Sequence, residues 1–163
     1  MAGMCFTSPL AVFASREPMQ ALTFFHTHTG EQLQINHVPG ILSVANQAKI
    51  NTFLRDFRTG AIHPIDSGLL DIISAVKTRT HNDGIIEVIS GYRSAETNQL
   101  LQGNSTGVAK KSLHMKGQAI DIRIRNLSTC NLRDVAANLR SGGVGYYAKS
   151  DFVHLDTGRS RTW

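Results

Sequence analysis

Apolar residues recur at helical spacing in several segments of the chain. Over 43–58 the apolar positions are three or four residues apart, and the same spacing returns over 67–79 and 128–140. Glycines follow the first and third segments, where they can end a helix in the left-handed conformation. The pattern predicts three amphipathic helices whose apolar stripes form part of a core, and a shorter helix over 96–101.

Other segments alternate apolar and polar residues, or are short and rich in β-branched residues, which is typical of strands. Strands are predicted over 21–25, 31–37, 85–90, 118–125, 145–147 and 152–156. The first two are expected to form a hairpin, and the glycine- and lysine-rich segment 103–113 a surface loop. Because helices and strands interleave with short connections, the predicted class is α+β, a small antiparallel sheet flanked by helices.

Composition narrows the kind of protein without naming a function. The 163 residues are 41% hydrophobic and 18% charged, which is typical of one folded domain and excludes a disordered, collagen-like or coiled-coil chain. No apolar run reaches the roughly 20 residues of a membrane-spanning helix, so no integral membrane segment is expected. Two cysteines exclude a disulfide framework and a multi-cysteine metal site. The net charge of +5 favours an anionic partner.

The first 14 residues differ in character from the rest. Residues 1–14 are mostly apolar and end in small residues, as the last part of an export signal does, although a basic segment is missing. The alternative is an unstructured terminus with no targeting role. We expect residues 1–14 to be the remnant of an export signal and residues 15–163 to form a single domain.

Two histidines and one aspartate are the strongest candidates for a metal site. His114 ends the glycine- and lysine-rich loop, and Gly117 allows a turn into the strand that carries Asp121 on its polar face. If the strand containing His154 pairs with it, all three side chains can meet. Two imidazoles and a carboxylate suffice for a catalytic zinc ion with one open position. The alternative assigns all three to ordinary structural roles.

Hydrolysis at such a site also needs a proton acceptor and a donor for the oxyanion. Asp151, at the turn before His154, is the first candidate for the base. Asp156 is its rival, although we favour it as a carboxylate that orients His154. Arg93, after a buried strand, is the candidate oxyanion donor, with a surface salt bridge as the alternative. Ser112 is a candidate for substrate binding.

These residues lie within motifs of a known family. The segment SLHMKGQAID (112–121) resembles the S-x-H-x-x-G-x-A-x-D signature of the M15 zinc peptidases, and DFVH (151–154) resembles their acid-x-x-His element. The periplasmic murein endopeptidase K group is similar in three further segments, which are ISGYRSAETNQLL, GGVGYY and FVHLDTGRSRTW. The likeness extends from about residue 20 to Trp163, and several motifs in the same order are more specific than one short match.

The resemblance implies zinc ligation by His114, Asp121 and His154, with Arg93 as the arginine that binds substrate or oxyanion. It also implies the zinc D-Ala-D-Ala peptidase-like (Hedgehog/DD-peptidase) fold. The expected protein is a periplasmic, monomeric, zinc-dependent peptidase that acts on peptidoglycan. Its expected substrate is the D-Ala–diaminopimelate or the diaminopimelate–diaminopimelate cross-link, or both.

Three other functions are weighed against this one. A D-alanyl-D-alanine carboxypeptidase of the same family would use the same residues on a terminal bond. A non-catalytic peptidoglycan-binding module would keep the fold, but the complete ligand set argues against it. A nucleic-acid-binding domain is supported only by the basic charge and by Lys110 and Lys111, without a recognisable binding motif, so no nucleic acid is expected.

Overall fold

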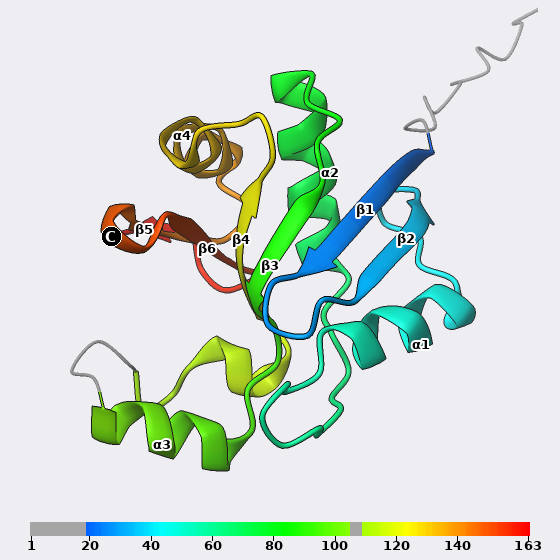
Figure 1. The fold of residues 1–163 in the computed structure, drawn as a ribbon. Coiled ribbons are helices and arrows are strands. Elements are labelled where there is room, and N and C mark those ends of the chain that lie inside the picture. Colours follow the sequence, from blue (N-terminus) through cyan, green and yellow to red (C-terminus); the bar gives the residue numbers. More distant parts are fainter. Residues whose placement is uncertain (1–18, 105–108) are drawn as a thin grey trace, which may run out of the picture.

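The computed structural model describes residues 19–104 and 109–163, so the predicted export remnant at 1–14 lies outside the described residues. The described residues form an α+β fold built on one seven-stranded sheet (Figure 1). The sheet contains β1 (Gln20–His26), β2 (Gln32–His37), β3 (Ile86–Ser90), β4 (Ala119–Ile124), β5 (Gly143–Tyr147), β6 (Phe152–Asp156) and β7 (Arg161–Thr162). Their order in space is β2-β1-β3-β4-β6-β5-β7.

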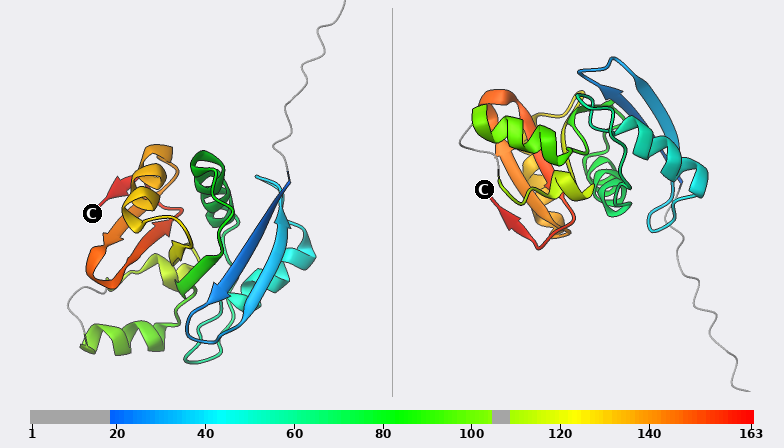
Figure 2. Two further views of the ribbon diagram at one scale, coloured as in Figure 1. Left: turned by 45° about the horizontal axis from the view of Figure 1, so that its top comes forward. Right: turned by 90° about the horizontal axis from the view of Figure 1, so that it is seen from below.

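The helices cover different parts of this sheet. They are α1 (Val44–Phe53), α2 (Gly68–Thr80), α3 (Ala95–Asn104) and α4 (Thr129–Leu139), with 3-10 turns η1 (Leu113–Lys116) and η2 (Ala148–Ser150). Helices α2 and α4 lie beside each other, and α4 packs on β4, β5 and β6, while α1 packs near the β2 edge. Helix α3 lies apart from this layer, below the sheet in the view of Figure 1 and again below it in the left view of Figure 2. None of the described helices is long and apolar enough to cross a membrane.

Alternation along β4 and β6 separates the core from the polar face. Ile122 is paired with Val153 across the two strands, and both side chains are completely buried in the core. One position along, Asp121 is paired with His154. Because successive side chains in a strand point to opposite faces, Asp121 and His154 lie together on the face away from that core.

The sheet is mixed, which corrects the prediction of an antiparallel one. Strand β3 pairs with β1 in parallel, and the two-residue strand β7 pairs in parallel with β5. The chain forms the β1–β2 hairpin and then α1 and α2 before β3 returns beside β1, and a crossover of this kind makes neighbouring strands parallel. Strand β7 was not predicted, because two residues carry no recognisable period.

The predicted helix over 43–58 is too long, because α1 ends at Phe53. The chain turns instead, and the buried Asp56 carboxylate accepts hydrogen bonds from the backbone N–H groups of Arg58 and Ser94 at 2.9 and 2.8 Å. Phe57, which continued the apolar spacing, stacks on His28 in this turn. The helices predicted over 67–79 and 128–140 are confirmed to within one residue at each end, and the short one extends over Ala95–Asn104.

Candidate metal centre and active-site cleft

A short 3-10 turn positions the first histidine. Ser112 caps η1 by accepting a hydrogen bond from the His114 backbone N–H at 3.3 Å, and Gly117 ends the turn in the left-handed conformation at φ 65°. The Nδ1 atom of His114 lies 2.7 Å from the Gly91 carbonyl oxygen, which can only accept a hydrogen bond. The Nδ1 atom therefore donates, and Nε2 is left as an acceptor that faces β4.

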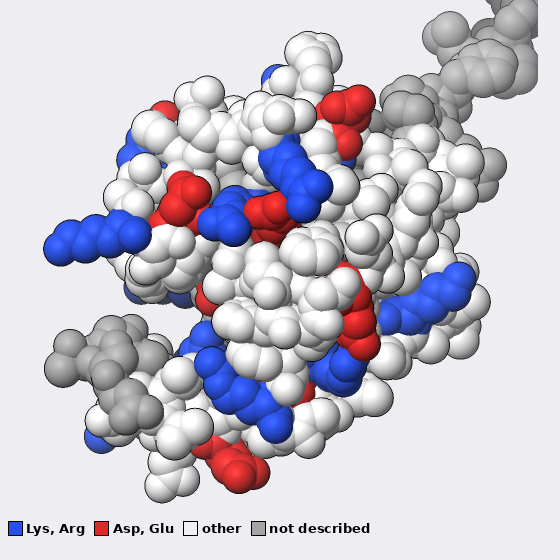
Figure 3. Space-filling model, in the orientation of Figure 1, with Lys and Arg blue, Asp and Glu red and all other residues white. Residues whose placement is uncertain are grey.

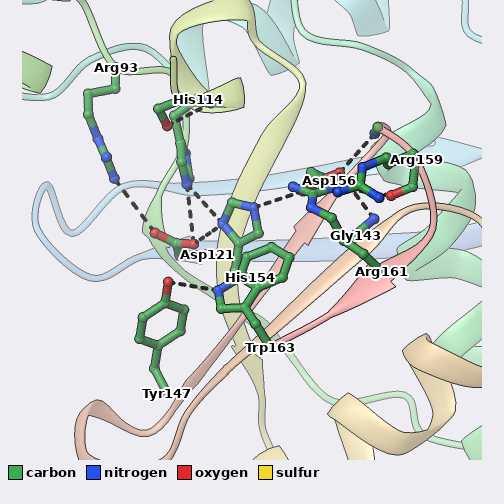
Figure 4. A network of polar contacts seen from close by, with 12 residues as sticks. Arg93, His114, Asp121, Gly143, Tyr147, His154, Asp156, Arg159, Arg161 and Trp163 are labelled. Carbon is green, nitrogen blue, oxygen red and sulfur yellow. Dashed lines mark hydrogen bonds and ion pairs between the residues drawn. The ribbon is translucent and has the colours of Figure 1, made fainter. Parts of the chain in front are cut away.

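Three donor atoms converge above the β4–β6 pair (Figure 4). His114 Nε2 lies 3.1 Å from His154 Nδ1, and Asp121 Oδ1 lies 2.8 Å from His154 Nδ1 and 3.3 Å from His114 Nε2. All three residues are buried. The ligand atoms of His114, Asp121 and His154 lie close enough together to hold one metal ion. The structure thus brings together the three predicted ligands.

The second nitrogen of His154 is bound to Asp156. His154 Nε2 lies 3.2 Å from Asp156 Oδ2, and the carboxylate also accepts from Arg161 and from the backbone N–H groups of Gly143 and Gly158. A proton on Nε2 leaves Nδ1 as the metal-facing atom, which is how outer carboxylates orient metal-binding histidines. Asp156 is completely buried and occupies this orienting position rather than the surface of the cleft.

The electrostatics of the group suit a bound cation. Burial alone would lower the pKa of His154, but its hydrogen bonds to Asp121 and Asp156 outweigh burial and raise it to about 9. Burial would raise the pKa of Asp121, but the charges and hydrogen bonds of His114 and His154 hold it well below its usual range. The site therefore favours positive charge beside Asp121. The ligand types, the orientation of both imidazoles and this electrostatic preference all fit a divalent cation such as zinc.

Arg93 lies beside the candidate metal group formed by His114, Asp121 and His154, called the metal group below, and is largely buried. Its Nη2 is 3.8 Å from Asp121 Oδ2, and its Nε has no hydrogen-bond partner among the described residues. The Arg93 backbone N–H donates to the His114 carbonyl. The next residue, Ser94, donates from both its backbone N–H and its hydroxyl to Asp56. No sequence pattern associates Asp56 with the site, because Asp56 lies 37 positions before Arg93.

The metal group forms the floor of a cleft of about 420 Å³. Figure 3 shows the molecule hollowed between α3 and the β5–β6 hairpin. Besides the predicted ligands and Arg93, the lining includes Lys111 and three aromatic residues, Tyr147, Phe152 and Trp163. None of the aromatic residues was a predicted site residue, although each lies in a segment that carries the family resemblance. A larger hollow of about 590 Å³ along α2 contains no predicted site residue.

The structure does not bring Asp151 into this cleft. Its side chain is 64% exposed, its Oδ1 accepts a hydrogen bond from the Thr129 hydroxyl at 2.8 Å, and its Oδ2 lies 3.8 Å from Arg123 Nη1. It does not line the cleft. To face the metal group, the Asp151 side chain would have to leave Thr129. Its role as the base stays a prediction.

Comparison with known proteins places the chain among the peptidases. A family model described as peptidoglycan L,D-endopeptidase MepK, of the M15 peptidases, matches residues 14–163, and the chain belongs to this family. The peptidoglycan L,D-endopeptidase MepK of Escherichia coli K12 is 41% identical over 158 residues, 96% of this chain and 86% of that protein. A probable peptidoglycan L,D-endopeptidase MepK of Haemophilus influenzae is 42% identical over 159 residues, 96% of this chain and 84% of that protein.

Proposed function

We propose that this chain is a zinc-dependent peptidoglycan endopeptidase that hydrolyses peptide cross-links. The observation that carries the proposal is the convergence of His114 Nε2, Asp121 Oδ1 and His154 Nδ1 at the floor of a cleft. The relatives are named L,D-endopeptidases, which favours a bond between an L and a D centre. Of the two cross-links considered, the diaminopimelate–diaminopimelate bond has this configuration, so we propose it as the substrate.

The proposed chemistry assigns a task to each residue near the ligands. When bound by His114, Asp121 and His154, zinc would supply a Lewis acid for the scissile carbonyl and lower the pKa of a water molecule. Arg93 is the proposed oxyanion donor, because its guanidinium is fixed beside Asp121 and its Nε has no partner among the described residues. Ser112 fixes His114 through the cap of η1, and Asp156 fixes the ring of His154.

Asp151 is the proposed proton acceptor. Its support is its position three residues before His154, where the resembling family has an acid. In this proposal the carboxylate turns from Thr129 toward the cleft when substrate binds, takes a proton from water and passes it to the leaving amine. Asp156 is a weaker candidate, since it is completely buried and already accepts hydrogen bonds from Arg161 and two backbone N–H groups.

The wider setting follows from the substrate. Peptidoglycan lies outside the cytoplasmic membrane, so we propose an exported, periplasmic protein in which residues 15–163 form the peptidase domain. We also propose the zinc D-Ala-D-Ala peptidase-like fold and a monomeric state. Fractionation of cells and size-exclusion chromatography with light scattering test the location and the monomer. A dimer in solution or a cytoplasmic protein would contradict them.

The activity is tested with purified cross-linked muropeptide dimers. The protein is incubated with each dimer, with and without a chelator and after zinc is restored, and the products are identified by mass spectrometry. We expect chelator-sensitive conversion of the diaminopimelate–diaminopimelate dimer to monomers. Release of terminal alanine alone would instead identify a carboxypeptidase. Binding without cleavage by the zinc-loaded protein would identify a binding module.

A further inference from the structure

Trp163 is fixed in the sheet beside the metal group. Its backbone N–H donates to the Val144 carbonyl at 3.2 Å, and its carbonyl accepts from the Tyr146 N–H at 3.0 Å. These two bonds continue the parallel pairing of β7 with β5. The indole is therefore attached to an ordered backbone next to β5, the strand that pairs with β6 and its residue His154.

Gly145 provides the space that the indole occupies. Gly145 is paired with His154 across β5 and β6, and a Cβ atom at Gly145 would lie only 2.6 to 2.8 Å from three atoms of the Trp163 indole. The φ angle of Gly145 is one that residues with side chains also adopt. Glycine is needed here because a side chain would occupy the space of the indole. The indole consequently lies close to the His154 ring, with 5.3 Å between the ring centroids.

Two other aromatic rings extend the indole surface, so that Tyr147, Phe152 and Trp163 together form an aromatic wall of the cleft. The indole N–H of Trp163 donates to the Tyr147 hydroxyl at 3.3 Å, and the Tyr147 ring stacks on Phe152 with centroids 4.6 Å apart. Yet Trp163 remains 51% exposed and Tyr147 38% exposed, and all three rings line the cleft. A fixed apolar surface that stays exposed inside a cleft is typical of a binding surface.

The cleft also contains cationic groups that can bind a carboxylate. Arg93 and Lys111 line it, and Lys111 is exposed, with no ion-pair partner among the described residues. The acidic side chain that lines the cleft within the described residues is the predicted ligand Asp121. A suitable ligand therefore combines an aliphatic stem, which packs on the aromatic wall, with a carboxylate, which meets the positive charge.

We propose that Trp163 is a specificity-determining residue whose indole packs on the aliphatic side chain of a diamino-diacid residue next to the scissile bond. This inference rests on the proposed function. The side chain of diaminopimelate has both required parts, a methylene chain and a terminal carboxylate. Alanine at the same position would present one methyl group and leave most of the indole uncovered.

The test compares two substrates and three variants. The substrates are a peptide dimer joined through two diaminopimelate residues and a matched peptide with alanine in place of the residue whose side chain faces the wall. For Trp163→Ala we expect a KM raised about tenfold or more on the first substrate, kcat within about threefold of wild type, and little change on the second. Trp163→Phe should keep most of the preference. Val44→Ala is the control, because Val44 is 88% exposed at the start of α1, near the β2 edge of the sheet, and does not line the cleft.

Metal content separates this role from a structural one. Equal losses on both substrates, or loss of bound zinc in Trp163→Ala, would overturn the proposal and assign the indole to packing against His154. Because Trp163 is the single tryptophan of the chain, its fluorescence also reports binding directly. Titration with the peptide L-Ala-γ-D-Glu-diaminopimelate should change the emission, and the same peptide ending in alanine should change it less. Equal responses would contradict the inference, whereas inactivity of wild type on every peptide would contradict the proposed function alone.

Discussion

Each nitrogen of the His154 ring lies beside a carboxylate, Asp121 at Nδ1 and Asp156 at Nε2. In Asp156→Asn the amide group can donate to Nε2, which favours the tautomer with its proton on Nδ1 and removes the metal-facing lone pair. We expect this variant to bind zinc about 10- to 100-fold more weakly. Competition with a chromophoric chelator measures the affinity. Asp134→Asn, an exposed carboxylate on α4, is the control, and equal affinities in both variants would show that Asp156 does not orient His154.

The role of Asp151 is resolved by comparing two changes at one hydrogen bond. Asp151→Asn removes the proton acceptor, and Thr129→Ala removes the hydroxyl that binds it, together with one methyl group. We expect Asp151→Asn to lower kcat by a factor of about 100 or more with zinc content unchanged, and Thr129→Ala to stay close to wild type. Steady-state kinetics and metal analysis measure both effects. Near-normal activity of Asp151→Asn would limit that carboxylate to the contact with α4.

His26 makes folding stability depend on pH at a point remote from the cleft. Burial, followed by the nearby His28, lowers the pKa of His26 from 6.5 to about 4. The unfolded chain therefore takes up a proton near pH 6.5 that the folded chain does not, so this contribution to stability is lost as pH falls from about 6.5 to 4. The loss is at most about 3.5 kcal/mol, since one pKa unit corresponds to about 1.4 kcal/mol.

The measurement is urea unfolding at a series of pH values. His26→Phe should flatten the dependence between pH 6.5 and 4, since the side chain already lies edge-on to Phe53 and Phe57. His81→Asn, at an exposed position after α2, should leave it unchanged. The same slope in wild type and in His26→Phe would show that other groups cause the dependence.

At the scale of elements, one buried carboxylate connects the turn after α1 with the start of α3. Asp56 accepts from the Arg58 N–H and from both donors of Ser94, and so fixes the backbone that follows Arg93. We expect Asp56→Asn to lower the free energy of unfolding by about 1–3 kcal/mol, because a buried hydrogen bond loses its acceptor. Urea unfolding measures this loss. Ser94→Ala, which keeps the backbone bond, should lose less, and equal stability of Asp56→Asn and wild type would contradict this role.

The sequence predicted elements well where one period continued from end to end. The apolar stripe of α2 and the alternation of apolar and polar residues along β4 were sufficient to predict both elements. The same alternation predicted that Asp121 lies on the polar face of β4, where it is paired with His154. Sequence-based prediction failed where a contact with a residue far away in the sequence determines the backbone conformation. The end of α1 depends on Asp56 and its bonds to Ser94, and such a contact across 38 positions leaves no periodic signal.

At the scale of the whole molecule, the metal group joins three segments, η1, β4 and β6. A ligand that binds only the folded state stabilises it by about 2.7 kcal/mol at 100 times its Kd. For a chain of this size, that raises Tm by about 5–10 °C. Differential scanning calorimetry with and without zinc measures the shift, and His114→Ala should show almost none. An equal shift in that variant would place the stabilising ion elsewhere.

The composition of the cleft was predicted only in part. The predicted site residues that line the cleft are Arg93, Ser112, His114, Asp121 and His154, and they could be predicted because polar residues next to strands and turns stand out against an apolar pattern. The aromatic wall was missed, because an aromatic residue near the end of a strand is equally typical of a core. Only the pairing of β7 with β5 reveals that Trp163 lies beside His154.

All three predicted ligands belong to the last third of the sequence, from His114 onward, and β6 carries the last of them. A ribosome makes the chain from its amino end, so the β1–β2 hairpin and the first two helices exist long before a complete ligand set does. Acquisition of the proposed metal would therefore be a late event in the life of each molecule. Because affinities of such sites for different divalent ions follow a general order, the ion taken up by the predicted ligands would depend on which metals are free in the compartment where folding finishes.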